Sequence, residues 1–236
     1  MLAATNFNIG MNYTQTDRHH QALCFFHEAV KMQKEFYGEY HPEVADMMYN
    51  IGVAQLEVGR VDEALDKFME ALLIRRLVFG NNHTNVIEAL HRIAKIHDLK
   101  GEKEESLNVL YQALHVERKD NPFSISVAKT LQNIAQIHHF IENLEKAIKT
   151  YEETLSVLIE NVGTNHQVVA SLLNVLGNLC MESGKISDSV LAYMKSQKIM
   201  EKIKSTGEAT DNETDLKILS LFGYSSEPQA TAAAAA

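Results

Sequence analysis

The chain has 236 residues, of which 45% are hydrophobic and 22% are charged, and its formal net charge is −9 at pH 7. These proportions are ordinary for a soluble folded protein, and the negative charge argues against nucleic acid as a partner because phosphate binding needs a basic surface. No apolar run reaches the ~18 residues of a membrane span, and no basic-then-apolar signal segment begins the chain. We therefore expect a cytoplasmic protein without direct membrane insertion.

An internal repeat of about 42 residues runs through the sequence. Each copy has an apolar residue followed by a small one, as in Ile51-Gly52, and further on a small–large–small set such as Ala64, Phe68 and Ala71. The most regular marker is a valine that recurs as Val44, Val86, Val127 and Val169. Repetition at this length is typical of stacked helical hairpins, each of which contacts only its neighbours. The repeat therefore predicts an all-α solenoid and favours binding over catalysis.

Five hairpins are predicted in chain order, at residues 2–41, 42–83, 84–123, 124–166 and 167–204. In the second hairpin Pro42 occupies a favoured position at the start of a helix, and Gly59 ends that helix. A second helix then runs from Val61 to a stop at Gly80. The recurring Gly and Ala positions let two helices cross closely, and the large residue of each set fills the space beside them.

The loops between hairpins also repeat. Three of them, at residues 38–42, 80–84 and 163–167, have a glycine and a histidine at the same places. We interpret these histidines as residues that fix the turn; they are His41, His83 and His166. The third junction, at residues 120–123, is one residue shorter and lacks both, which predicts a locally altered turn.

The repeat stops after about residue 204. Residues 205–223 read as a linker with a capping-box pattern and a short apolar helix at 215–222. Because the last repeat of a solenoid needs a cover, this helix is expected to cap the fifth hairpin; the alternative is that it occupies the groove. Residues 224–236 form an alanine-rich tail that we expect to be disordered. The absence of a polar cap before the first helix indicates a part of a larger chain or complex.

The second copy carries the clearest family features. Its junction reads Gly38-Glu39-Tyr40-His41-Pro42-Glu43-Val44-Ala45, and its second helix contains Ala71-Leu72-Leu73-Ile74-Arg75. Over residues 2–204 the chain resembles the tetratricopeptide repeat (TPR), in the 42-residue subtype of kinesin light chains. The resemblance implies a right-handed α-solenoid and a non-enzymatic scaffold, such as a kinesin light chain-like cargo adaptor, with a protein or peptide partner. The same subtype occurs in signalling proteins, so the alternative is a regulatory or sensor module whose C-terminal helix is autoinhibitory.

The resemblance places a peptide-binding groove on the first helix of each hairpin. Asn8, Asn50 and Asn133 share one repeat position, where a side-chain amide would bond to the backbone of an extended peptide; the alternative is three ordinary solvated residues. Arg92 and Lys129 would contact acidic side chains. Apolar residues at the N-terminal end suit an apolar anchor on the partner or an upstream helix. The predicted groove consists of Phe7, Asn8, Met11, Tyr49, Asn50, Val53, His91, Arg92, Lys95, Lys129, Gln132, Asn133, Gln136 and Asn174.

No catalytic or metal-binding pattern is present. The sequence has no glycine-rich phosphate loop, no HExxH and no Ser/His/Asp pattern. Of the 11 histidines, His97 and His138 recur at one repeat position, and we interpret them as packing residues between helices. Cys24 and Cys180 lie at opposite ends of the predicted array and are expected to be unpaired thiols in a reducing compartment. We predict no enzymatic activity, no metal and no cofactor.

Overall fold

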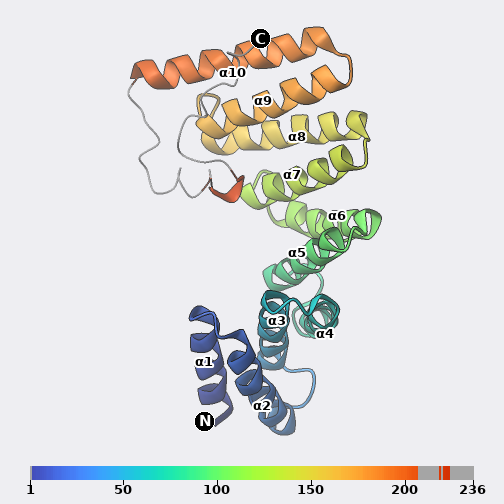
Figure 1. Ribbon diagram of the computed structural model, residues 1–236, viewed down its shortest axis with the longest axis vertical. Coiled ribbons are helices and arrows are strands. Elements are labelled where there is room, and N and C mark those ends of the chain that lie inside the picture. The colour runs from blue at the N-terminus through green and yellow to red at the C-terminus, as the bar shows by residue number, and fades with distance from the viewer. Residues whose placement is uncertain (1, 207–217, 219, 224–236) are drawn as a thin grey trace. The chain divides into compact units, whose positions relative to one another are not determined.

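The computed structural model describes residues 2–206, 218 and 220–223. Within this part of the chain the structure consists of helices without strands, which confirms the all-α prediction (Figure 1). The elements are α1 (Leu2–Gln15), α2 (His19–Tyr37), α3 (Pro42–Glu57), α4 (Val61–Phe79), α5 (Thr84–Leu99), α6 (Lys103–Asp120), α7 (Ile125–Phe140), α8 (Leu144–Val162), α9 (Gln167–Glu182) and α10 (Ile186–Thr206). Residues 218, 220 and 221 are also helical. The predicted capping box, most of the linker and the alanine-rich tail lie outside the described residues.

The helices belong to two compact units, Met1–Lys119 and Asp120–Ala236. Consecutive helices pair as hairpins: α1 with α2 and α3 with α4 in the first unit, α7 with α8 and α9 with α10 in the second. Successive hairpins pack on one another through α2 and α3, α4 and α5, and α8 and α9. The extensive packing thus joins helices that are adjacent in sequence, as expected of a repeat protein.

The junction histidines cap the helices that follow them. In each case the imidazole Nδ1 accepts a hydrogen bond from the backbone N–H two residues later. The pairs are His41–Glu43, His83–Asn85 and His166–Val168, with N···N distances of 3.3, 3.2 and 3.1 Å. At the third junction Ser124 takes this role, since its Oγ accepts from the Val127 N–H at 3.2 Å. The difference expected at this junction therefore includes a change of capping residue.

Inside the hairpins, a large side chain packs against the position of the small residue. A Cβ atom added to the glycine would lie too close to the facing ring in three hairpins. The nearest ring atoms would be 2.6 Å away for Gly10–Phe26, 3.0 Å for Gly52–Phe68 and 2.7 Å for Gly177–Tyr193. Ala94 and Ala135 occupy this position in the other two hairpins and are buried. The small residues therefore set how closely the two helices of a hairpin approach.

Among the described residues, the two cysteines form no disulfide and His138 belongs to no metal-binding group. Cys24 and Cys180 are free thiols, and burial raises the pKa of the Cys180 thiol. His138 is only 3% exposed, in agreement with a packing role. The described residues contain no group of three or more His, Cys, Asp or Glu placed to hold a metal ion. None of the described helices is long and apolar enough to cross a membrane.

Candidate peptide-binding groove

The first unit carries the groove residues predicted on α1, α3 and α5. Asn8 and Lys95 are exposed, and the remaining side chains are half-buried. Phe7, Met11 and Tyr49 pack against one hydrophobic cluster, whose buried members include Phe26 and Ile51. The apolar N-terminal residues therefore contribute to the core of the first two hairpins as well as to the surface, which leaves less of each side chain for a partner.

Tyr49 lies at the centre of a group of aromatic and basic side chains. Its ring is 5.3 Å from the ring of Phe68, and the guanidinium carbon of Arg75 lies 4.6 Å from its centroid. The Nε–H of Arg92 donates a hydrogen bond to the Tyr49 hydroxyl at 3.0 Å, which joins α5 to α3. Arg92, predicted to contact acidic side chains of a partner, is thus held in place by a neighbour within the groove.

Arg75, which the sequence analysis did not assign to the site, lies beneath this surface. Its side chain comes from α4 and is only 4% exposed. It donates hydrogen bonds to the Asn85 carbonyl at 2.7 Å and to Asp46 Oδ1 at 3.0 Å, and its Nη1 lies 3.6 Å from Glu88 Oε2. Both carboxylates are about half exposed, at 49% and 54%. A buried cation therefore balances two acidic residues on the helices that carry the predicted groove, and it links α3 to α5.

The position of Arg75 recurs in the neighbouring hairpins with a polar residue each time. Gln33, Arg75 and Glu117 each lie seven residues after the large residue of the set, and each is buried. Gln33 donates to the carboxylate of Glu43, and Glu117 Oε1 lies 3.2 Å from His91 Nε2. Because buried polar groups need partners, Gln33 joins its hairpin to the next one, whereas Glu117 joins the two helices of its own hairpin. A polar residue that recurs on the apolar face of a helix was the signal in the sequence.

The three asparagines that share one repeat position differ in how exposed their side chains are. Asn8 is exposed, whereas Asn50 and Asn133 are half-buried. The Nδ2 of Asn50 donates to the Asp46 carbonyl of its own helix at 2.7 Å, so its Oδ1 is the atom better placed to meet a peptide N–H. The three asparagines remain predicted contacts, with Asn50 restricted to one orientation of its amide.

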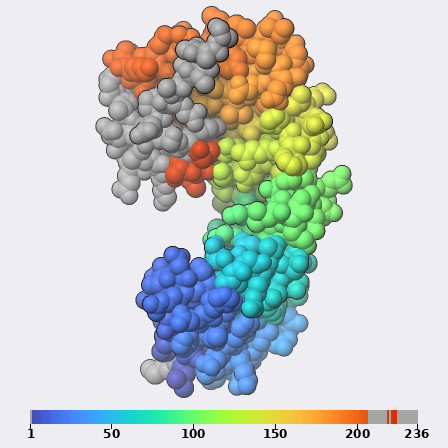
Figure 2. All heavy atoms as spheres, viewed as in Figure 1, coloured from blue at the N-terminus to red at the C-terminus, as the bar shows by residue number. Residues whose placement is uncertain are grey.

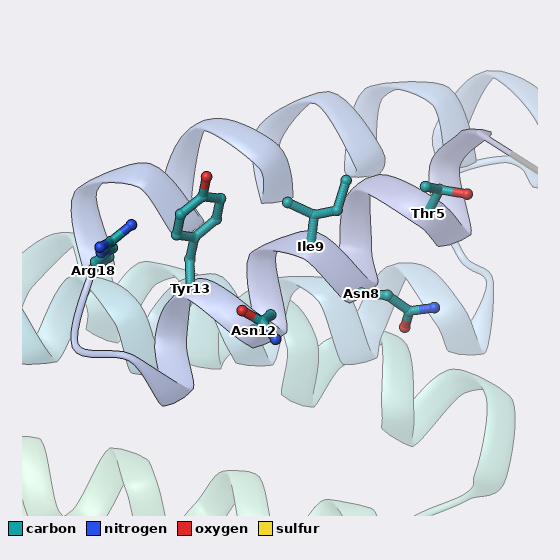
Figure 3. A pocket seen from close by; sticks show the side chains of 6 residues that line it. All are labelled: Thr5, Asn8, Ile9, Asn12, Tyr13 and Arg18. Carbon is teal, nitrogen blue, oxygen red and sulfur yellow. The ribbon is translucent and has the colours of Figure 1, made fainter.

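A hollow of about 540 Å³ lies against α1 in the first unit (Figure 3). All of its lining residues come from α1 and from the turn that follows it: Thr5, Asn8, Ile9, Asn12, Tyr13 and Arg18. Asn8 is the one predicted groove residue among them. The hollow thus presents amide, hydroxyl and guanidinium groups, and its lining does not include α3 or α5.

The second unit carries the remaining predicted residues on α7 and α9. Gln136 and Asn174 are exposed, but Gln132 is only 3% exposed. The reason is a contact from the C-terminal part of the chain: the Nε2 of Gln132 donates to the main-chain carbonyl of Phe222 at 3.2 Å. Figure 2 shows this C-terminal segment, in red, against the surface of the unit that contains α7.

Lys129 completes the contact with Phe222. Its Nζ lies 5.6 Å from the centroid of the Phe222 ring and donates to Gln132 Oε1 at 3.3 Å. Burial lowers the pKa of Lys129 because it disfavours the ammonium form. Phe222 itself is only 3% exposed. Sequence reasoning had placed Phe222 in an end cap or in the groove; the described residues of the segment lie against predicted groove residues of α7.

Comparison with known proteins identifies the repeat. The model of the tetratricopeptide repeat matches residues 1–72, 47–118 and 126–202, which is most of the chain. The chain belongs to the tetratricopeptide repeat family. No curated protein sequence matches this TPR chain.

Solved TPR structures resemble this chain in fold. The kinesin light chain-like, nearly identical TPR repeats from Podosopora anserina give a TM-score of 0.70 at 15% identity, covering 84% of this chain and 95% of theirs. BtubC (BKLC) from P. vanneervenii gives 0.69 at 14% identity, covering 83% and 78%. MamA from Desulfovibrio magneticus RS-1 gives 0.60 at 20% identity, covering 86% and 96%. These likenesses support an α-solenoid of TPR hairpins and, at such low identity, show the fold alone.

Proposed function

We propose that this TPR protein is a non-enzymatic scaffold whose first helices bind a peptide or helical segment of a protein partner. The observation that carries the proposal is the fixed polar surface of the first unit, where Tyr49 is held between Arg75 and Arg92. Side chains that are already ordered lose little conformational freedom when a ligand binds. A rigid surface of this kind suits recognition of another chain. Within this role, a kinesin light chain-like cargo adaptor is the finer assignment that we propose.

The partner segment would meet different chemistry along the groove. Asn8 and the Oδ1 of Asn50 would bond to its main chain. The half-exposed carboxylates of Asp46 and Glu88 favour a basic side chain at the level of α3 and α5, whereas the exposed Lys95 favours an acidic one further along α5. The groove of the first unit would therefore bind a segment that carries both basic and acidic side chains.

The proposal is tested by affinity capture from native lysate followed by mass spectrometry. The bait is the full chain, compared with an Asn50→Ala/Asn133→Ala double variant that is shown to be folded by circular dichroism. Asn108→Ala is the matched control, because Asn108 is an exposed asparagine on the second helix of its hairpin. We expect prey proteins that are lost with the double variant and kept with the control. Identical prey for all three baits would place binding away from the asparagine position.

A second candidate function is regulatory, and the contact between Phe222 and α7 favours it. In this case the C-terminal segment would be autoinhibitory in a sensor module of a larger signalling protein. Truncation after residue 206 is then expected to raise partner affinity without changing the melting temperature. A lower melting temperature with unchanged affinity would instead assign the segment to the stability of the array.

A further inference from the structure

The described C-terminal residues place one side chain deeply against α7. Phe222 is 3% exposed, whereas its neighbour Leu221 is 43% exposed. The segment is helical at residues 218, 220 and 221, and the chain turns at Phe222 and Gly223. The Phe222 N–H donates to the Ile218 carbonyl at 3.2 Å, as in a last helical turn. Among the described residues of this segment, Phe222 is therefore the one that anchors it to α7.

Two side chains of α7, Lys129 and Gln132, recognise separate parts of Phe222; we call them the α7 site. The ammonium of Lys129 faces the aromatic ring, a contact that strengthens when the cation is partly removed from water. The amide of Gln132 accepts from Lys129 and donates to the Phe222 carbonyl. The last carbonyls of a helix have no partner within the helix, and Gln132 supplies one. The site thus requires a ring and a free carbonyl on the same residue.

We infer that the α7 site is a docking site for an aromatic residue at the C-terminal end of a short helix, and that Phe222 of this chain is its resident occupant. The inference rests on the proposed function, because it names what one part of the groove binds and how that part is kept closed. A protein partner that uses the α7 site must present the same ring-and-carbonyl group and displace Phe222. Such a partner competes with an occupant that belongs to the same chain, and covalent attachment raises the effective concentration of a ligand at its site.

The test uses the full chain, its Phe222→Ala variant and a Leu221→Ala control, whose altered side chain is exposed and next in sequence. Hydrogen exchange of residues 125–140 reports whether Phe222 covers α7. A fluorescent peptide with the sequence of residues 213–224 reports whether the vacated site binds the same segment in trans. Peptides with alanine or leucine at the phenylalanine position measure the requirement for a ring. Gln132→Ala in the Phe222→Ala chain removes the amide that donates the hydrogen bond to the main-chain carbonyl.

We expect faster exchange of α7 in Phe222→Ala only, together with peptide binding at least about tenfold tighter than in the unaltered chain, because the tethered competitor is gone. Both substituted peptides and the added Gln132→Ala change should weaken binding. Equal exchange in Phe222→Ala and Leu221→Ala would overturn the inference, as would equal binding of the phenylalanine and leucine peptides. Faster exchange without peptide binding would make Phe222 a fold contact only and would also refute it. In that case, loss of prey proteins with the Asn50→Ala/Asn133→Ala bait in the capture experiment would still support the scaffold function. Failure of the α7 inference can therefore be distinguished from failure of the proposed function.

Discussion

Replacing Gly10 by alanine probes the packing that sets the spacing of the helices within a hairpin. The new Cβ would lie 2.6 and 2.7 Å from two ring atoms of Phe26, which is fully buried and has no solvent-facing side to move into. The same change at Gly52 places the Cβ 3.0 to 3.2 Å from the equally buried ring of Phe68. Both glycines lie in the first unit, on the first helix of a hairpin, and each faces a phenylalanine ring. The two substitutions therefore differ mainly in how closely the new Cβ approaches that ring.

Two opposing effects determine the size of the change. Alanine is favoured over glycine in a helix interior by about 1 kcal/mol, and overpacking of a core costs about 1–3 kcal/mol. At Gly52 a shift of a few tenths of an ångström removes the overlap, so the net effect is expected near zero. At Gly10 the ring or the helix must move further, and we expect a stability about 1–2 kcal/mol below that of Gly52→Ala.

The assay is urea unfolding of the full chain, combined with hydrogen exchange of residues 2–37 because repeat arrays can open one hairpin at a time. A double-mutant cycle adds Phe26→Leu to Gly10→Ala, which recreates the alanine and leucine that the third hairpin has at these positions, Ala94 and Leu110. We expect a favourable coupling of about 1 kcal/mol. Equal stability of Gly10→Ala and Gly52→Ala, or no coupling, would refute the argument that this contact sets helix spacing.

Three further predictions concern buried polar and capping groups. Arg75→Met keeps an apolar stem but removes the hydrogen bonds to the Asn85 carbonyl and its acidic partner, so urea unfolding should show a loss of about 2 kcal/mol; an unchanged midpoint would contradict this. His83→Ala removes the acceptor for the Asn85 N–H and should cost about 1 kcal/mol, whereas His83→Ser retains an acceptor and should cost less. Burial, and secondarily the charge of Lys146, lower the pKa of His138 below its ordinary 6.5. The unfolded chain therefore binds the proton more readily, and unfolding free energy should fall as pH drops through about 6.5 toward the folded pKa. His138→Gln should reduce this dependence of the unfolding free energy on pH. The measurement is urea unfolding between pH 7.5 and 5.5, and an equal pH dependence in the variant and the unaltered chain would contradict the prediction.

The sequence by itself determined the helical repeat and its local chemistry. The periodic small and large residues, such as Gly52 and Phe68, identify the faces on which two helices must meet, because close approach requires the absence of a Cβ. The junction histidines could be assigned to turns for a similar reason: each caps a backbone N–H only two residues away. Contacts of this kind depend on neighbours in the chain, and a repeat displays them several times.

The tertiary structure decided which polar groups pair across helices. The sequence analysis gave Arg75 only as part of a family motif, yet its buried side chain donates a hydrogen bond to Asp46, which is 29 residues away. Gln132 meets the carbonyl of Phe222 across 90 residues. The period of the apolar residues predicts which face of a helix is buried. Pairing between distant side chains depends instead on the distances between helices, and these distances follow from the packing of the whole unit.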